Sequence, residues 1–291
     1  MNSSPSIAFV GLGAIGLPMA SCIAARGFDV IGVEPLPVGR ERAAEAGIRS
    51  VASIDEVGAV QTVVVMVATA DQLASVVDAA LGHEVARARW VVMSTVGGAA
   101  VRREAERIVA AGGAVVDAPV SGGVARARIG ELALFVSGTT ADIDAVRPVL
   151  DAMGTPRVVG AAVGDGQSVK VVNQHLCSVH IVAAAEALAL AERLDLDPAF
   201  ILDVVGKGAA ASFMLGDRGP RMLQDDAPVL SQIGIFVKDS GLVADAAAEA
   251  GIELPLLAAA RERYLLAEEQ GLRTHDDSSV IETYRTEASA S

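Results

Sequence analysis

The segment that most constrains this chain is the glycine-rich turn Gly11-Leu12-Gly13-Ala14-Ile15-Gly16. The apolar residues 6–10 before the turn predict a short buried strand, and residues 18–25 after it predict a helix with proline in its first turn. A second apolar strand is predicted over 29–33, and it ends at Glu34. A strand, a glycine turn, a helix and a second strand that ends in an acid form the fingerprint of a dinucleotide-binding unit.

Each part of this fingerprint has a physical task. The glycines permit a tight turn, the close approach of a pyrophosphate and the close packing of the helix on the strand. The start of the helix offers unpaired N–H groups and the positive end of a dipole to the phosphates. We therefore predict that all six residues from Gly11 to Gly16 bind the cofactor. The alternative, a glycine-rich turn in some other α/β protein, does not explain the acid that ends the second strand.

Glu34 bears on the choice of cofactor. A carboxylate at this position can accept hydrogen bonds from the ribose hydroxyls of the adenosine and repel a 2′-phosphate. Pro35 follows it directly, and the nearest arginines, Arg40 and Arg42, lie further along the chain. The sequence therefore predicts NAD, with NADP less favoured. The simpler alternative for Glu34 is a solvated charge at a strand end.

The alternation of strands and helices continues to about residue 160. The apolar run 62–67 is typical of a central parallel strand that is covered on both faces. Further strands are predicted over 90–93, 114–117, 132–138 and 157–160, and helices over 72–81, 98–111 and 141–152. This pattern predicts an α/β fold, a Rossmann-type doubly wound sheet over residues 1–163.

Ligands of such sheets bind at the carboxyl ends of the strands. Three predicted strands end at Ala68-Thr69, at Ser94-Thr95 and at the segment from Asp117 to Gly123. We expect Ala68, Thr69 and Thr95 to line the cofactor site together with the glycine turn.

Strand signals stop after Gly164. Helices are predicted over 167–193, 198–208, 212–224, 234–250 and 255–269, which indicates an all-α second domain over residues 164–291. The helix from about 167 links the two domains, and we expect the polar tail 278–291 to be weakly ordered at its end.

The linking helix carries Lys170 and Asn173 one turn apart, beside an apolar stripe that includes Val172 and Leu176. A lysine whose pKa is lowered by burial from about 10.4 can exchange a proton near neutral pH. An asparagine one turn away can orient that amine or hold a substrate oxygen. Taken alone, these residues favour the alternative of a surface lysine beside a capping amide.

Composition excludes several classes of protein. The net charge of −13 disfavours binding to nucleic acid or to an anionic membrane surface. The most apolar tract, 181–191, is too short to span a bilayer, and the start of the chain lacks the basic region of a signal peptide. Cys22 and Cys177 show no paired spacing, which fits a reducing cytoplasm, and the four histidines show no metal-ligand spacing.

Together, four segments resemble the β-hydroxyacid dehydrogenase family over nearly the whole chain: 11–20, 117–123, 164–173 and Lys238-Asp239. The resemblance implies a Rossmann domain, an all-helical substrate and dimerisation domain, and a homodimer or homotetramer. It also implies a small anionic hydroxy-acid substrate. Ser121, Gly122 and Gly123 match the loop that binds the substrate carboxylate in that family, although a plain tight turn explains the glycines as well.

The resemblance also assigns roles to five further residues. Lys170 matches the family's catalytic lysine and Asn173 the amide beside it. Lys238 matches a residue near nicotinamide and substrate, with direct substrate contact and cofactor contact both open, and Asp239 matches its neighbouring carboxylate. The family commonly has Asn-Asn after the lysine, whereas Gln174 follows Asn173 here. With the segments around it, this departure looks like the branch that includes L-threonate dehydrogenases, and we expect Gln174 to contact the substrate.

Two other functions are compatible with this architecture. Imine reductases are similar in fold, but they usually lack a lysine at the position of Lys170. A non-catalytic dinucleotide-binding sensor would have no need of Lys170 and Asn173. The sequence therefore favours a hydroxyacid dehydrogenase, an oxidoreductase that interconverts a short polar hydroxy acid and its oxo acid.

Overall fold

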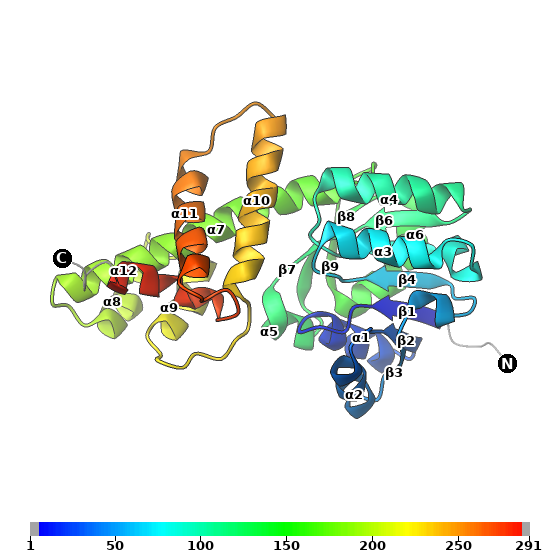
Figure 1. Ribbon diagram of the computed structural model, residues 1–291, viewed down its shortest axis with the longest axis horizontal. Coiled ribbons are helices and arrows are strands. Elements are labelled where there is room, and N and C mark those ends of the chain that lie inside the picture. Colours follow the sequence, from blue (N-terminus) through cyan, green and yellow to red (C-terminus); the bar gives the residue numbers. More distant parts are fainter. Residues whose placement is uncertain (1–5, 287–291) are drawn as a thin grey trace. The chain divides into compact units, whose positions relative to one another are not determined.

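The computed structural model describes residues 6–286 of the chain (Figure 1). The chain divides into two compact units. The first ends at Lys170 and the second begins at Val171, so that the two units meet inside one helix, α7 (Asp165–Arg193).

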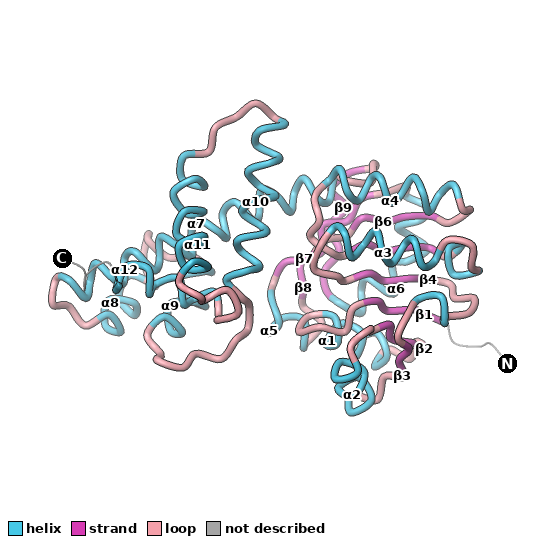
Figure 2. Tube along the Cα trace, in the orientation of Figure 1, coloured by secondary structure: helices cyan, strands magenta, loops and turns pink. Residues whose placement is uncertain are grey.

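Within the described residues the first unit contains one nine-stranded sheet, drawn in magenta in Figure 2. Six parallel strands follow the order β3-β2-β1-β4-β5-β6, which is the Rossmann strand order. Strand β8 pairs antiparallel with β6 and β7, and parallel with β9. The strands are β1 Ser6–Val10, β2 Asp29–Val33, β3 Arg49–Val51, β4 Thr62–Val65, β5 Arg89–Val92, β6 Ala114–Asp117, β7 Val120–Ser121, β8 Leu132–Ser137 and β9 Gly154–Gly160.

The helices of this unit cover both faces of the sheet, because successive side chains of a strand point to opposite faces. In β1, Ile7 and Phe9 pack into one apolar cluster, whereas Ala8 and Val10 pack into another. Helices α1 and α6 contribute to the first cluster, and α3 and α4 to the second. The helices are α1 Gly16–Ala25, α2 Pro37–Glu45, α3 Ala70–Ala80, α4 Gly98–Ala110, α5 Gly123–Arg128 and α6 Thr140–Met153. The predicted fold class is confirmed.

Some elements of this unit were not predicted. Helix α2 buries only Gly39 and Ala43, so it has almost no apolar periodicity from which to predict a helix. The edge strand β3 is three residues long and polar at its start, and β7 has two residues. Strand β9 begins at Gly154, three residues before the predicted start, and carries Pro156. Short edge strands and proline in a strand both weaken the sequence pattern of a strand.

The described residues of the second unit form helices joined by loops, with an isolated β-bridge between Gln232 and Asp276. The core forms where apolar residues of α7, such as Ile181 and Leu188, meet Phe236 of α10 and Tyr264 of α11. The rings of Phe236 and Tyr264 stack with centroids 5.4 Å apart, and the Tyr264 hydroxyl donates to the carbonyl of Ser178 at 2.9 Å. The helices after α7 are α8 Pro198–Val205, α9 Phe213–Met222, α10 Ile233–Glu249, α11 Pro255–Glu269 and α12 Glu282–Thr286.

The chain segment after α11 is better ordered than its composition indicates. A 3₁₀ helix forms over Asp277–Ile281 and α12 follows it directly. Arg221 of α9 donates to Asp276 at 2.9 Å, and Arg218 pairs with Asp277 at 2.9 Å. Burial raises the pKa of Asp276, but hydrogen bonds from Ser278, Arg221 and backbone amides outweigh it, so the net pKa is lowered. The end of the predicted weakly ordered tail, residues 287–291, lies outside the described part of the chain.

Two properties of α7 bear on the sequence analysis. The apolar stripe beside Lys170 is largely exposed, with Val172 at 63% and Leu176 at 49%. The helix as a whole, 29 residues long, is also long and apolar enough to cross a membrane, although the tract 181–191 alone is not. Half of its most apolar window is buried inside the protein, a property shared by the core helices of soluble proteins.

Candidate functional site

The glycine turn after β1 is closely packed at its two ends and open in the middle. A Cβ at Gly11, which has φ of +91°, would lie 2.3 Å from the carbonyl oxygen of Met66, and one at Gly16 would lie 1.9 Å from that of Gly11. A Cβ at Gly13 would meet no atom within 4 Å. Among the described residues no side chain caps the start of α1; the Leu17 N–H donates to the carbonyl of Gly13 at 3.1 Å, and Pro18 has no N–H. This open cradle fits a dinucleotide pyrophosphate.

Glu34 is not a solvated charge. Its side chain accepts hydrogen bonds from the backbone N–H of Leu12 and of Leu36, both at 3.1 Å, and the residue is 8% exposed. Gly39 leaves room for this carboxylate, because a Cβ there would lie 2.5 Å from the Cγ of Glu34. Arg40 donates to the carbonyl oxygens of Glu34 and Pro35, both at 2.8 Å. The carboxylate therefore joins the end of β2 to the glycine turn.

The segments after β4 and β5 lie at the same edge of the sheet. Thr69 caps α3 by accepting from the Gln72 N–H at 3.2 Å, and the Gln72 side chain accepts from the N–H of Ala68 at 2.8 Å and of Thr69. The Ser94 hydroxyl accepts from the N–H of Val67 at 2.8 Å, which ties the end of β5 to the end of β4. Thr95 follows Ser94 at this edge. These contacts give Thr69 a capping task, and cofactor contact by Ala68, Thr69 and Thr95 stays a prediction.

A buried polar network fastens the start of α7 to the ends of β5 and β6. Gln167 donates to the carbonyl of Ser94 at 3.0 Å and to Asp117 at 2.8 Å, and its carbonyl accepts from the N–H of Val96 and Gly97, both at 3.1 Å. Asp117 also accepts from the N–H groups of Gly164 and Gln167.

The groups around Asp117 affect the pKa of its carboxyl and hold the start of α7 close to β8. Burial raises the pKa of this carboxyl, and the hydrogen bonds from Gln167, Gly164 and the Ser137 hydroxyl oppose the increase. The hydroxyl of Ser137 lies 3.3 Å from Asp117 and accepts from the N–H of Gly166 at 2.9 Å. A Cβ at Gly166 would lie 2.4 Å from the carbonyl oxygen of Phe135, so only glycine fits this close approach of α7 to β8. Sequence reasoning missed Gln167 and Ser137 as site residues.

Lys170 lies one turn after Gln167 and is 7% exposed. The network therefore places the lysine-bearing turn at the carboxyl edge of the parallel sheet, the edge from which the glycine turn also leaves. The alternative of a solvent-exposed surface lysine is wrong.

Ser121 ends β7, Gly122 is the N-cap of α5, and Gly123 is the first residue of that helix. Both glycines have positive φ, 138° and 69°, so the turn itself requires glycine. A Cβ at Gly123 would meet no atom within 4 Å, so the turn has open space in front of it. A tight turn and a binding loop are compatible here, and the binding role stays a prediction.

In the second unit the predicted residues on α7 and α10 come together. Gln174 donates to Asp239 at 2.5 Å, and Lys238 pairs with Asp239 at 2.8 Å. Asn173 donates to the side-chain carbonyl of Gln174 at 2.8 Å. Lys238 has a side chain only 26% exposed and is ion-paired, so a freely solvated charge does not describe it.

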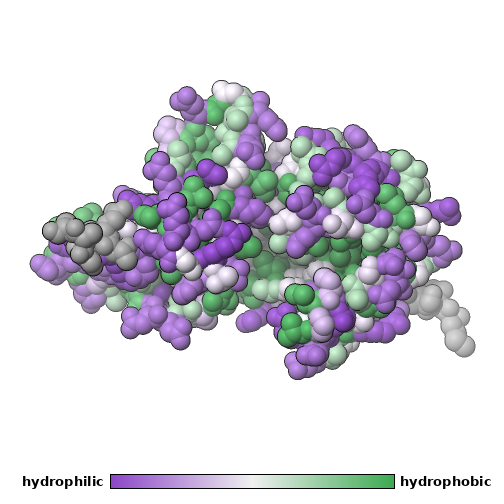
Figure 3. Space-filling model, viewed as in Figure 1, coloured by the Kyte–Doolittle hydropathy of each residue, from purple (hydrophilic) through white to green (hydrophobic). Residues whose placement is uncertain are grey.

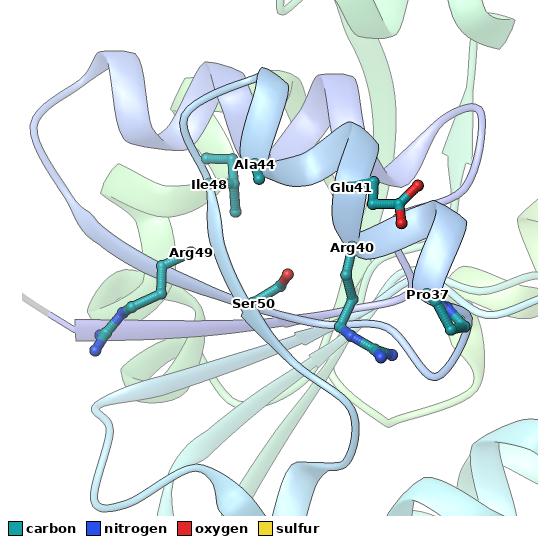
Figure 4. Close-up of a pocket in the computed structure, with 7 residues that line it drawn as sticks. All are labelled: Pro37, Arg40, Glu41, Ala44, Ile48, Arg49 and Ser50. Atoms are coloured by element: carbon teal, nitrogen blue, oxygen red, sulfur yellow. The ribbon is translucent and has the colours of Figure 1, made fainter.

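The surface hollow in Figure 4 involves none of the residues predicted for the site. It has a volume of about 390 Å³ and lies between α2 and β3. The hollow is lined by Pro37, Arg40, Glu41, Ala44, Ile48, Arg49 and Ser50. Within residues 6–286, no group of three or more His, Cys, Asp or Glu side chains is placed to hold a metal ion.

Comparison with known proteins agrees with this geometry. Residues 6–164 match the family described as the NAD binding domain of 6-phosphogluconate dehydrogenase. Residues 164–284 match the family described as NAD-binding of NADP-dependent 3-hydroxyisobutyrate dehydrogenase. The chain is 38% identical to L-threonate dehydrogenase of Cupriavidus necator, over 97% of this chain and 96% of that protein. The chain belongs to the β-hydroxyacid dehydrogenase family. Membership confirms the prediction of an NAD(P)-binding hydroxyacid dehydrogenase at the level of the family.

A solved β-hydroxyacid dehydrogenase shows the same architecture. The crystal structure of 3-hydroxyisobutyrate dehydrogenase from Salmonella typhimurium superimposes with a TM-score of 0.89 at 33% identity, over 96% of this chain and all of that one. An imine reductase from Streptomyces aurantiacus reaches a TM-score of 0.66 at 20% identity, a likeness that shows the fold alone.

Proposed function

We propose that this protein oxidises one hydroxyl group of a short polar hydroxy acid, L-threonate or a close analogue, to the oxo acid with NAD. The observation that carries the proposal is the Asp117–Gln167 network, which holds the turn before Lys170 at the sheet edge where the glycine turn opens. The likeness to L-threonate dehydrogenases supports the choice of substrate class.

The predicted cofactor and substrate segments have distinct tasks in this proposal. Residues of the glycine turn hold the pyrophosphate, with Ala68, Thr69 and Thr95 beside the cofactor at neighbouring strand ends. The bound nicotinamide supplies the hydride acceptor. The substrate carboxylate binds the N–H groups of Gly122 and Gly123 and the hydroxyl of Ser121, while Lys238 and Asp239 border the substrate.

Lys170 acts as the general base that takes the proton of the substrate hydroxyl during oxidation, and as the acid that returns it during reduction. Its low exposure keeps the amine away from bulk water, which would otherwise compete for the proton. Asn173, one turn further along α7, orients the amine or the substrate oxygen. An imine reductase or a non-catalytic sensor is less well supported, because neither explains a buried lysine at this position.

The cofactor preference follows from Glu34. Its carboxylate sits directly beside the glycine turn, where it repels a 2′-phosphate. Arg40, the nearest arginine, is held by two backbone carbonyls. NAD is therefore the proposed cofactor.

Two further properties belong to this proposal. We infer a homodimer or homotetramer formed through the helical unit, where Leu190, Leu194, Phe200 and Val204 expose more than half of their surface. Figure 3 shows hydrophobic side chains among hydrophilic ones on the visible face. The proposed location is the cytoplasm, with no membrane and no nucleic acid as partner, in keeping with the net charge of −13.

The experiment that tests the function is an NADH absorbance assay with four substrates: L-threonate, D-erythronate, D-glycerate and 3-hydroxyisobutyrate. The proposal expects L-threonate or its epimer to give the highest kcat/KM, and NAD to be preferred over NADP. Absence of turnover with all four acids and both cofactors would overturn it.

A pair of lysine variants tests the role of Lys170. Lys170→Ala should lower kcat by about 10²- to 10⁴-fold, the usual contribution of a general acid or base, while NAD affinity stays within about twofold. The matched control is Lys207→Ala, because the Lys207 side chain is 72% exposed and forms a surface ion pair with Asp203 at 2.6 Å. Turnover of Lys170→Ala at the wild-type rate would remove Lys170 from the mechanism.

A further inference from the structure

We propose that Gln174 is a positioning residue that fixes which side of the Asn173 amide faces the reacting groups. It does so through a chain of hydrogen bonds that begins at the Lys238–Asp239 ion pair. The inference rests on the proposed function, because it states which group of the Asn173 amide, the NH₂ or the oxygen, faces the reacting groups.

The chain of contacts lies entirely within the second unit. The amine of Lys238 is 2.8 Å from one carboxylate oxygen of Asp239, and the Nε2 of Gln174 donates to the other at 2.5 Å. The Nδ2 of Asn173 donates to the Oε1 of Gln174 at 2.8 Å. Asp239 and Gln174 are 3% and 6% exposed, so water has little access to these bonds.

The chemistry of the groups dictates the direction of every bond. A carboxylate only accepts hydrogen bonds, and the carboxylate of Asp239 forms an ion pair with Lys238. Gln174 must therefore turn its NH₂ group toward Asp239 and its carbonyl away from it. A carbonyl also only accepts, so Asn173 must present its own NH₂ group to Gln174. The amide orientation of Asn173 follows from the charge of Asp239, two side chains away.

The consequence concerns the oxygen of Asn173. Its Nδ2 is occupied by Gln174 and by Cys177, whose sulfur is 3.4 Å away. The Oδ1 points away from these partners, since the two groups of an amide lie on opposite sides. Asn173 therefore offers an acceptor to its other neighbours, which suits the hydroxyl of a substrate or the amine of Lys170 one turn earlier.

The length of Gln174 is essential to this arrangement. Its amide has to reach Asp239 on α10 with one group and Asn173 on α7 with the other. An asparagine at position 174 is shorter by one C–C bond and could not make both contacts. Gln174, the departure from the Asn-Asn pair of many relatives, is thus the residue that couples Asn173 to the ion pair.

A double-mutant cycle separates this role from simple packing. Gln174→Met keeps the side-chain length but removes both hydrogen-bonding groups, and Asn173→Ala removes the group that Gln174 is proposed to orient. We expect Gln174→Met to lower kcat about 10-fold or more with NAD affinity unchanged. In the Asn173→Ala background the same substitution should change kcat by less than about twofold, because its target is gone. Multiplicative losses in the double variant, or a wild-type kcat for Gln174→Met, would overturn the proposal.

A second readout does not depend on turnover. The side-chain NH₂ resonances of Asn173, assigned by their loss in Asn173→Ala, report its hydrogen bond to Gln174 directly. They should shift in Gln174→Met and stay in place in Gln224→Met, a control on an exposed glutamine of the same unit. Unchanged resonances in Gln174→Met would refute the relay even if the enzyme were active. Shifted resonances in a protein that oxidises no hydroxy acid would support the relay and refute the proposed function.

Discussion

The Asp117–Gln167 network gives the most direct test of how the first unit supports the lysine. The perturbation is Gln167→Met, which fills the same space and removes all four side-chain hydrogen bonds of Gln167. Three of these join neutral backbone groups and the fourth joins the carboxylate of Asp117. At about 0.5–1.5 kcal/mol for a neutral bond and about 1.5–3 kcal/mol for a charged one, the loss is roughly 3–7.5 kcal/mol. Native domains are stable by only about 5–15 kcal/mol, so this is a large fraction.

The assay is urea unfolding of the wild type and the variant, followed by circular dichroism. The matched control is Gln61→Met, because Gln61 is an exposed glutamine of the same unit just before β4 and should change stability by less than about 0.5 kcal/mol. We also expect kcat to fall, since the turn before Lys170 loses its attachment to β5 and β6. A loss below about 1 kcal/mol, or an equal loss in Gln61→Met, would refute the reasoning.

Three further predictions concern the cofactor and the acid stability of the protein. Gly13→Ala should leave stability nearly unchanged and weaken NAD binding about 10- to 100-fold, as measured by fluorescence titration. The added methyl group fits the empty turn but occupies the place of the pyrophosphate. Gly16→Ala should instead destabilise the fold, because a Cβ there would meet the carbonyl of Gly11. Glu34→Gln should reduce the preference for NAD over NADP about 5- to 10-fold in kcat/KM, whereas Glu41→Gln, an exposed change of the same charge, should not. Asp276→Asn should cost about 3 kcal/mol at pH 7. Because the folded pKa of Asp276 is lowered from its ordinary value of 3.8, its contribution is present above that value and lost as the pH falls through the folded pKa, so the stabilities of the two proteins should converge at acidic pH.

The central part of the first unit could be predicted from sequence because its signals are local. A parallel strand that is covered on both faces reads as an unbroken apolar run, as in 62–65, and the glycine turn with Glu34 spans fewer than thirty residues. Helix α2 and strand β3 escaped prediction because they are polar and lie at the sheet edge. The conformation of β3 depends on its pairing with β2, and α2 packs against β3; a local sequence pattern contains neither contact.

The site illustrates the same limit. Asp117 and Lys170 were identified with their motifs, but the contact that links these motifs, from Asp117 to Gln167, joins residues 50 positions apart. Gln167 reads in sequence as an ordinary polar residue in a first helical turn. The bond from Gln174 to Asp239 spans 65 positions and depends on how α7 packs against α10. The sequence motifs therefore identified several residues of the site, whereas the contacts between them depend on tertiary packing.

Helix α7 has a practical consequence for dissecting this enzyme. The two units meet between Lys170 and Val171, so a fragment cut at that point would end in the second turn of a 29-residue helix. The last four carbonyl groups of the fragment would lose their intrahelical partners, and the lysine would become a fraying chain terminus. Expression of the dinucleotide-binding half by itself should therefore retain several further turns of this helix.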